Sequence, residues 1–385
     1  MASTPEVLVL RGTTWNHSRG FTPMVATAQR YSELHPGVEI IWDKRSLQAF
    51  GDQSVDTLAA RYDLLVIDHP WAGMAASSGV LLPLDEHLPA SFLREQAANS
   101  VGASHRSYIT EARQWALAID AAAPVASWRP DLLAVGDIPQ TWDGLMQLAH
   151  SGKVLLPGTP VDTLMNFYMI CSTLGEDVCR TSEAVVSSPT GTRALEMLRE
   201  LAQALDPIVW ELNPIRVYET MTALDRFAYC PFAFGYSNYA RPGYARKLLA
   251  FGDMVEIEGR RCRTTLGGAG LAISSRCAHM KTALDYAVFV SGPACQSTLY
   301  FDSGGQPGHR LAWTDERVNA SCRDYFRNTL PVLDRAFMRP RYSGYVDFQS
   351  RAGHPVHEYL RDGGNAAAVL AELNALHHES QTKTG

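Results

Sequence analysis

Apolar and polar residues follow a repeating order over the first 85 residues, in which each short apolar run precedes a longer amphipathic segment. Short apolar runs predict strands, and amphipathic segments of this length predict the helices that connect them. The predicted strands are Val7–Leu10, Val38–Trp42 and Tyr62–Ile67. The predicted helices are Pro23–Leu34, Leu47–Arg61 and Trp71–Gly79. This alternation indicates an α/β unit built on a parallel sheet.

The pattern becomes mixed after Trp115, where strands and helices no longer alternate regularly. Thr141 is suited to cap a helix that begins at Trp142, because a threonine hydroxyl can accept a bond from the first free amides of a helix. The other predicted strands are Trp115–Ile119, Phe232–Tyr236 and Gly270–Ser274, and helical spacing recurs over 194–205, 282–290 and much of 330–378. A second lobe of mixed structure is therefore expected.

Composition places the chain among globular proteins large enough for two domains. It has 385 residues, of which 46% are hydrophobic and 19% are charged. Thirty-four basic residues against 40 acidic ones give a net charge of −6, and the basic residues are scattered. No basic footprint for nucleic acid is present, and no apolar run is long enough to span a membrane. The expected partner is a small molecule.

Neither a disulfide framework nor a metal site is predicted. The seven cysteines are widely spaced, odd in number and without a CxxC pair, so most are expected to be buried thiols. His354 and His357 lie three residues apart but lack an HExxH context, and we expect them to face solvent. The Gly267–Gly270 run lacks the spacing of a dinucleotide fingerprint. No metal and no cofactor are expected.

Polar and aromatic side chains gather where the predicted strands end. Ligands of parallel sheets lie beyond the carboxyl ends of the strands, so these positions are candidate binding residues. From the first lobe they are Trp15, His17, Arg19, Arg45, Asp68, His69 and Asp120. From later segments we add Tyr236, Asn238 and Gly268, which belong to an aromatic and amide turn and to a glycine-rich run. Such a set is suited to a polar or anionic small molecule.

Each candidate also has a structural alternative. Trp15 is suited to stack on a ligand, but a tryptophan at a strand end equally serves packing. His17 can accept hydrogen bonds or act as a general base, or it can simply cap its loop. Arg19 can bind an anion or pair with Asp43 or Asp68. Asp68 can face a ligand beside His69, or it can cap the helix that begins near Pro70.

Several motifs, taken in order, resemble the type 1 extracellular solute-binding proteins of ABC importers, the group that includes the maltose-binding protein. They are HPGVEI (35–40), YDLLVID (62–68), GVLLPLDEHL (79–88), WRPDLL (128–133), PQTWDGLMQLA (139–149) and LGGAGLAIS (266–274). The resemblance covers roughly residues 7–290. It implies an α/β periplasmic-binding-protein-like fold of type II, with two lobes that close on a small molecule, followed by a helical C-terminal extension.

On this resemblance the domain boundaries follow the pattern of elements. Lobe one is expected to comprise residues 1–120 plus about 282–330, and lobe two residues 121–281. Residues 331–385 are expected to form a helical segment that packs on a lobe. In this arrangement Trp15 and Tyr236 would supply apolar faces, and Arg19 and Arg45 would bind oxygens. Asp68, His69, Asp120 and Asn238 would fix the orientation of the ligand, with Gly268 bringing backbone amides close to it.

The leading function hypothesis is reversible binding of a sugar, polyol or hydroxy acid, for an ABC importer whose membrane subunits would be the protein partners. The alternative is a cytoplasmic enzyme built on the same fold, in which His17 or His69 is the general base, Asp68 orients it and Arg19 stabilises negative charge. A sensor is a third hypothesis.

The start of the chain bears on these hypotheses. Met1–Leu10 has no basic segment and only a four-residue apolar run, which is not the pattern of a signal peptide. A cytoplasmic location is expected for the chain as numbered from Met1, and a periplasmic one if a signal peptide was removed.

Overall fold

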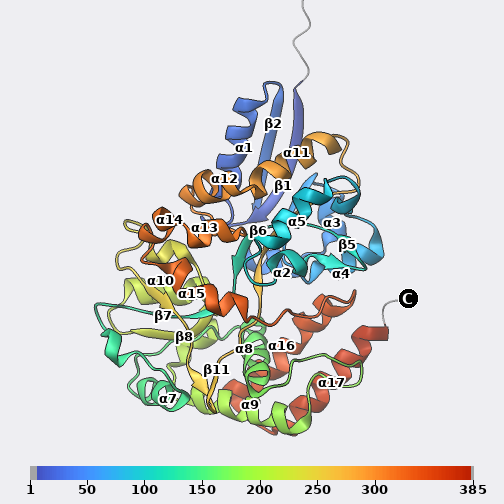
Figure 1. The fold of residues 1–385 in the computed structure, drawn as a ribbon. Helices are drawn as coiled ribbons and strands as arrows, with labels where there is room; N and C mark the ends of the chain where they lie inside the picture. The colour runs from blue at the N-terminus through green and yellow to red at the C-terminus, as the bar shows by residue number, and fades with distance from the viewer. Residues whose placement is uncertain (1–6, 383–385) are drawn as a thin grey trace, which may run out of the picture. The chain divides into compact units, whose positions relative to one another are not determined.

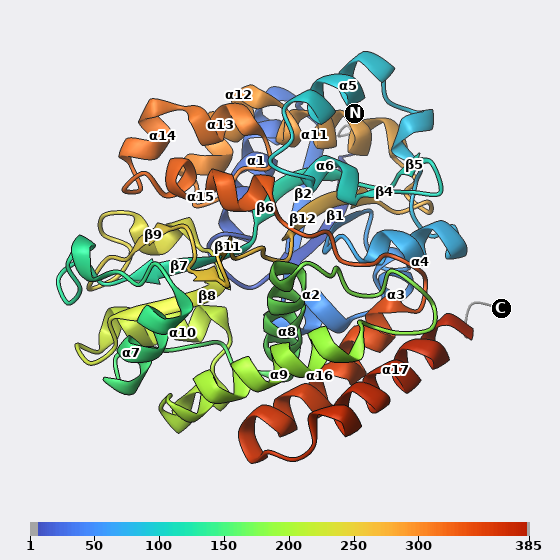
Figure 2. The same ribbon diagram turned by 60° about the horizontal axis from the view of Figure 1, so that its bottom comes forward.

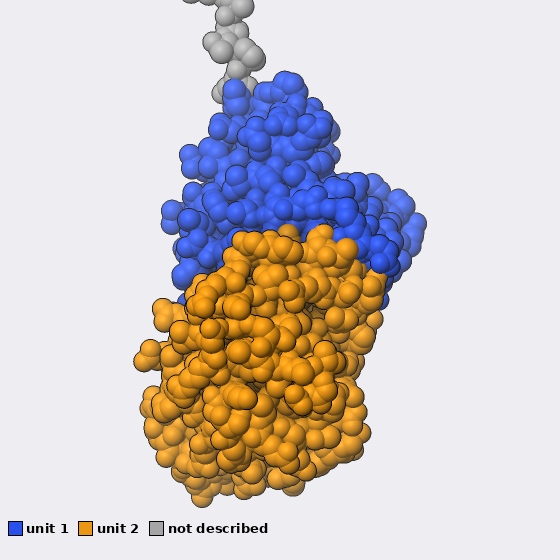
Figure 3. All heavy atoms as spheres, turned by 90° about the vertical axis from the view of Figure 1, so that its left-hand side faces the viewer, with its two compact units in different colours: residues 1–121, 267–318, 341–343 blue, residues 122–266, 319–340, 344–385 orange. Residues whose placement is uncertain are grey.

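The computed structural model describes residues 7–382, so the expectations for Met1–Glu6 and for the last three residues lie outside the described part of the chain. These residues divide into two compact units, coloured separately in Figure 3. Unit 1 comprises residues up to 121 together with 267–318 and 341–343. Unit 2 comprises 122–266, 319–340 and 344 onward. The lobe boundaries drawn from the sequence stay predictions.

Unit 1 is built on a five-stranded sheet whose strand order is β2-β1-β3-β12-β6. The strands are β1 (Leu8–Trp15), β2 (Val38–Arg45), β3 (Leu64–Ile67), β6 (Leu117–Ala122) and β12 (Gly267–Ile273). β1 runs parallel to β2 and to β3, which confirms the predicted parallel arrangement of the first three strands. β12 runs antiparallel to β3, so the sheet as a whole is mixed. The sheet is mixed because the chain returns to unit 1 after residue 266 and places β12 between β3 and β6.

Helices surround this sheet, and Figure 1 shows α1 and α11 alongside β1 and β2. The helices of unit 1 are α1 (Thr22–Leu34), α2 (Leu47–Asp52), α3 (Val55–Ala59), α4 (Trp71–Ser78), α5 (Ala90–Ala98), α6 (Ser104–Ser107), α11 (Met280–Ser291), α12 (Pro293–Cys295), α13 (Arg310–Thr314) and α14 (Glu316–Ala320), the last of which runs on into unit 2. Shorter elements are η1 (Leu84–Glu86), η5 (Gln296–Tyr300), β4 (Ile109–Thr110) and β5 (Arg113–Gln114).

The predicted helix Leu47–Arg61 is wrong in its continuity. α2 ends at Asp52, where Gln53 takes an extended backbone conformation, and α3 begins after Ser54. Gly51 in the last turn of α2 weakens the helix at this point. The start of α2 follows the expected rule, since the Ser46 hydroxyl accepts a hydrogen bond from the amide of Ala49 at 3.1 Å.

The core of unit 1 lies between the sheet and helices α1 and α11. Leu10, Leu64 and Val66 on the strands are fully buried, as is Met24 on α1. Tyr286 of α11 reaches into this core, where its hydroxyl lies 2.9 Å from the hydroxyl of Thr27 on α1. The apolar spacing that predicted these helices therefore marks the faces that pack on the sheet.

Unit 2 holds a smaller antiparallel sheet in the order β8-β7-β9. Its strands are β7 (Pro124–Trp128), β8 (Tyr229–Phe234) and β9 (Ala250–Gly252), and β10 (Glu256–Ile257) pairs with β11 (Arg260–Arg261) as a hairpin. The helices are α7 (Trp142–His150), α8 (Pro160–Leu174), α9 (Ser188–Gln203), α10 (Pro214–Ala223), α15 (Tyr325–Asp334), α16 (Tyr345–Asp362) and α17 (Ala366–Thr382), with the turns η2 (Val135–Asp137), η3 (Pro207–Glu211) and η4 (Ser237–Ala240).

The helical C-terminal part of the chain packs within unit 2. α16 contacts α8, α9 and α17, and Figure 2 shows α9, α16 and α17 side by side. Gly353 allows the close approach of α16 to α8, because a Cβ at this position would lie 2.5 Å from the carbonyl oxygen of Pro160. Thr141 caps α7 as predicted, since its hydroxyl accepts from the Gly144 amide at 3.2 Å.

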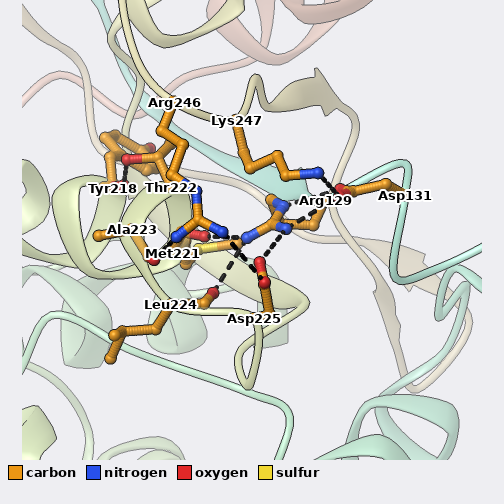
Figure 4. Close-up of polar contacts among 10 residues, drawn as sticks. All are labelled: Arg129, Asp131, Tyr218, Met221, Thr222, Ala223, Leu224, Asp225, Arg246 and Lys247. Atoms are coloured by element: carbon orange, nitrogen blue, oxygen red, sulfur yellow. Dashed lines mark hydrogen bonds and ion pairs between the residues drawn. The ribbon is translucent and has the colours of Figure 1, made fainter.

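Arg129, which follows β7, is fully buried and uses every N–H of its guanidinium (Figure 4). Nε and Nη2 donate to the two carboxylate oxygens of Asp131 at 2.7 and 2.9 Å, and Nη2 also donates to Asp225 at 2.8 Å. Nη1 donates to the carbonyls of Met221 and Leu224 at 2.6 and 3.0 Å. These carbonyls end α10, so the arginine joins β7 to the C-terminus of that helix, where a positive charge is favourable.

Replacement of Arg129 by methionine is expected to destabilise the protein by about 2–4 kcal/mol, because the apolar stem remains while two carbonyls and two carboxylates lose the hydrogen bonds that Arg129 donates to them. Urea unfolding followed by circular dichroism measures this change. Arg246→Met is the matched control, since Arg246 pairs with the same Asp225 but is 65% exposed. An effect of Arg246→Met as large as that of Arg129→Met would contradict the assigned role.

Candidate functional site

The strand ends of unit 1 meet at one edge of its sheet. Trp15 is the register partner of Arg45, and Thr13 is level with Leu65, so β1, β2 and β3 end together. β12 is antiparallel and pairs Gly270 with Ile67, so it begins at the same edge. We call these strand ends and the loops that follow them the carboxyl edge. It brings together Trp15, Arg45 and Gly268 from three strands, together with His17, Arg19, Asp68 and His69 in the loops.

The loop after β1 folds back on the tryptophan that precedes it. Trp15 is 3% exposed, and its ring lies 5.1 Å from that of Phe50 on α2. Gly20 packs on the other part of the ring, where a Cβ would come within 2.3 Å of the indole atoms. Packing by Trp15 is therefore observed, and its contact with a ligand stays a prediction.

His17 stabilises this loop through its side chain. The backbone amide of Arg19 donates to Nδ1 of His17 at 2.9 Å, so the neutral imidazole carries its proton on Nε2. Burial, and secondarily the positive charge of Arg19, lowers the pKa of His17 to about 3. The imidazole therefore stays neutral at physiological pH. A general base works best when its pKa lies near the working pH, so this environment does not favour the catalytic role considered for His17.

Arg19 and Asp120 form a buried ion pair in unit 1. Nε of Arg19 donates to one carboxylate oxygen at 2.8 Å and Nη2 donates to the other, with side-chain exposures of 4% and 0%. This partner lies 101 residues away on β6, whereas the structural alternative expected from the sequence was Asp43 or Asp68. Burial still raises the pKa of Asp120, and Arg19 counteracts this shift.

Gly268 lies against the backbone of Asp120. Its φ is +117°, and a Cβ at this position would lie 2.4 Å from the carbonyl oxygen of Asp120. The glycine thus lets β12 pass close to β6. This packing explains the residue without a ligand, and the predicted approach of its amide to a bound solute stays a prediction.

Asp68 and His69 follow β3 and face each other. Oδ1 of Asp68 accepts from the amide of His69 at 2.8 Å and lies 3.4 Å from Nδ1 of the ring. His69 is 1% exposed, and its ring meets that of Tyr108 edge-on at 6.5 Å. The alternative that Asp68 caps α4 is wrong, because that helix begins after Pro70 without a side-chain cap.

Arg45 ends β2 and reaches back across the sheet. Nη2 donates to the carbonyl of Val66 at 2.8 Å, and Nη1 lies 3.3 Å from the hydroxyl of Thr13. The guanidinium carbon lies 5.4 Å from the ring centroid of Phe50. Phe50 therefore borders both Trp15 and Arg45. Phe50 is not among the residues predicted from the strand ends, although its place one turn after the Ser46 cap was a usable signal.

Tyr236 and Asn238 belong to unit 2, where they follow β8. Tyr236 is 4% exposed and packs edge-on with Tyr218 at 6.3 Å, and Asn238 lies in η4 with 1% exposure. The strand predicted over Phe232–Tyr236 ends at Phe234, so Tyr236 lies in the turn that follows it. Their roles toward a solute stay predictions.

The described residues add little further chemistry. Between residues 7 and 382 no three His, Cys, Asp or Glu side chains are grouped so that they could hold a metal ion. No helix in that part of the chain is both long and apolar enough to cross a membrane. Six of the seven cysteines are buried thiols, as predicted. His354 is exposed, but His357 is buried, and its Nδ1 lies 2.7 Å from the carbonyl oxygen of Gly158, so the expectation of solvent exposure is wrong for His357.

Residues 26–309 match the sequence model of a family described as bacterial extracellular solute-binding protein. No protein of curated function matches the chain. Among solved structures, T. maritima MalE3 with bound maltose has a TM-score of 0.85 at 16% identity, covering 98% of this chain and 100% of that one.

Two further structures show the same fold. A solute-binding protein of an ABC transporter from Agrobacterium radiobacter K84, in complex with ribitol, has a TM-score of 0.81 at 16% identity and covers 98% of this chain and 100% of that one. Another from Thermotoga lettingae TMO, bound to α-D-tagatose, has a TM-score of 0.80 at 16% identity and covers 99% and 100%. The α/β fold class expected from the sequence is confirmed.

The depressed pKa of His17 predicts a pH effect on stability. The unfolded chain binds a proton at His17 below about pH 6.5, whereas the folded chain resists protonation down to about pH 3. Stability is therefore lost as the pH falls through this window. His17→Gln, which keeps an acceptor for the Arg19 amide, is expected to flatten the fall in unfolding free energy between pH 7 and 4.5. Urea titrations at several pH values measure it, with exposed His87→Gln as the control. An unchanged slope in His17→Gln would contradict the prediction.

Gly268→Ala is expected to destabilise the protein by about 2–4 kcal/mol, since it adds a clash with the Asp120 carbonyl to the strain of a positive φ. Thermal and urea unfolding measure the loss. Gly152→Ala separates the two causes, because Gly152 has a φ of +72° but open space within 4 Å of the position that a Cβ would take. Equal losses in the two variants would show that the clash with β6 contributes nothing.

Proposed function

The chain belongs to the bacterial extracellular solute-binding protein family, and we propose that it reversibly captures a small polyhydroxylated solute, a sugar or a polyol, for an ABC importer. The family membership confirms the solute-binding function expected from the sequence. The solute class is supported by the bound molecules of three structural relatives, which are maltose, ribitol and tagatose.

The observation that carries the proposal is the convergence of polar side chains at the carboxyl edge of unit 1. Ligands of α/β sheets lie beyond the carboxyl ends of the strands. Arg45 is a donor there, and Asp68 is an acceptor. A sugar hydroxyl both donates and accepts, so an edge that offers both kinds of group suits it.

We propose that Asp68 binds hydroxyl groups of the solute. A carboxylate accepts hydrogen bonds about twice as strong as those of a neutral acceptor. The proposed role of Asp120 is different, since both of its oxygens accept from Arg19 and its carboxylate is fully buried. Arg19 and Asp120 are therefore assigned to holding the loop after β1 in place.

The enzyme hypothesis gains no support. It required His17 or His69 as a general base, but the pKa of His17 lies at about 3, and His69 is 1% exposed. Binding without chemistry needs neither histidine to transfer a proton.

The proposed partners and location follow from the family. Its description as extracellular favours the periplasmic alternative for this chain, and the ABC-transporter relatives favour the membrane subunits of an importer as partners.

A thermal-shift screen tests the function. Maltose, ribitol and tagatose are used first, and at least one polyhydroxylated compound is expected to raise the midpoint, since a ligand present at 100 times its Kd adds about 2.7 kcal/mol. The bound compound is recovered and identified by mass spectrometry, and it is expected to be unchanged. A compound recovered in altered form would overturn the proposal in favour of an enzyme.

Asp68→Asn tests the site. It is expected to weaken solute binding tenfold or more in isothermal titration calorimetry, because the amide replaces a charged acceptor by a neutral one. Asp285→Asn removes the same charge from α11, where Asp285 is 56% exposed, and serves as the control. Equal affinities of the Asp68→Asn variant and the control would remove Asp68 from the site.

A further inference from the structure

Arg45 is partly buried and has no carboxylate partner among the described residues. Its side chain contacts neutral groups: the hydroxyl of Thr13, the carbonyl of Val66 and the ring of Phe50. Nε is buried and makes no hydrogen bond within residues 7–382. A guanidinium removed from water without a counter-charge is unfavourable, and proteins ordinarily pair such groups.

Two other buried arginines of the chain show the contrast. Arg19 is forked on Asp120, and Arg129 is held by two aspartates and two carbonyls. Burial lowers the pKa of Arg45 to about 10, and the phenol of Tyr62 opposes this shift. The group still carries its proton at neutral pH. The carboxyl edge thus contains a positive charge that the described part of the chain leaves without a carboxylate.

A second donor lies beside it. Trp15 is the register partner of Arg45, and both side chains border Phe50. Trp15 is 3% exposed, yet its Nε1 has no hydrogen-bond partner among the described residues. A buried N–H without an acceptor costs about 1–3 kcal/mol. Two neighbouring strands therefore each present a buried donor that lacks an acceptor within residues 7–382.

We propose that the solute carries a carboxylate, which binds to Arg45 with Trp15 Nε1 as a second donor, so that the natural ligand is a sugar acid and not a neutral sugar. This inference rests on the proposed function and narrows it. An ionised carboxylate supplies both the missing charge and acceptors for both donors. A phosphate dianion fits less well, because the single positive charge of Arg45 would face two negative charges.

Pairs of compounds that differ only in the acid test the proposal. Isothermal titration calorimetry compares gluconate with glucitol, ribonate with ribitol, and galacturonate with galactose, and glucose 6-phosphate is added as the phosphate arm. We expect the acid of at least one pair to bind at least tenfold more tightly than its neutral partner. Raising the salt concentration is expected to reduce that preference, since the contact is between charges.

Variants assign the preference to Arg45. Arg45→Gln is expected to weaken binding of the acid at least tenfold more than it weakens binding of the neutral partner, because a hydroxyl that accepts from Arg45 loses only a neutral contact. Arg45→Lys, which keeps the charge but loses the fork, is expected to retain part of the preference. Trp15→Phe is expected to weaken binding of the acid two- to fivefold while it keeps the packing on Phe50. Arg30→Gln is the control, because it removes the same charge from α1, where Arg30 is 52% exposed.

The outcomes separate this inference from the function beneath it. Neutral partners that bind as tightly as their acids overturn the inference and leave solute binding intact. Tighter binding of glucose 6-phosphate than of gluconate overturns the choice of carboxylate. Binding of none of the compounds overturns the proposed solute class and the inference together. If circular dichroism shows that Arg45→Gln does not fold, the affinities for each acid and its neutral partner are compared in the unaltered protein and in Arg45→Lys. That comparison then tests whether the solute carries a carboxylate.

Discussion

The Arg19–Asp120 ion pair is the interaction on which the carboxyl edge of unit 1 depends. β1 and β6 are separated in the sheet by β3 and β12, and this pair joins the loop after β1 to β6 across both. The two hydrogen bonds to Asp120 hold the side chain of Arg19 in place, and the backbone amide of Arg19 donates to Nδ1 of His17. The same loop lays Gly20 on the ring of Trp15. Two charges buried together are stable only while both are present, since the loss of one leaves the other without a partner.

Arg19, Arg129 and Arg45 differ in what they bind, and this difference separates a structural role from the proposed role in recognition. Arg129 and Arg19 donate to groups of the chain itself, so each is complete without a ligand. Arg45 is held by neutral acceptors. A side chain of the first kind fixes elements relative to their neighbours within a unit. A side chain like Arg45, whose charge has no carboxylate partner among the described residues, can bind the carboxylate of an incoming molecule.

The sequence predicts the edge but not the partners within it. Short apolar runs locate β1, β2 and β3, and the carboxyl-end rule then selects Trp15, Arg45 and Asp68, because both arguments depend on local pattern alone. The partner of Arg19 depends on a contact between residues 101 apart, which no local pattern encodes. The role of Gly268 could not be predicted for the same reason. Its glycine-rich run suggested a contact with a ligand, whereas the structure shows that a side chain at this position would clash with the backbone of β6. The break between α2 and α3 escaped prediction because the apolar spacing continues across it.

Binding without chemistry is consistent with how the edge is built. His17 is held neutral by burial and by an amide that donates to it, so protonation would cost both the burial energy and that bond. Such a histidine orders the loop, and its low pKa does not favour proton transfer near neutral pH. Arg45 and Trp15 are both packed against Phe50, and this packing restricts the motion of the two side chains. Fixed donors of this kind favour capture that is tight and reversible, since the protein gains an interaction on binding and regains only solvent on release.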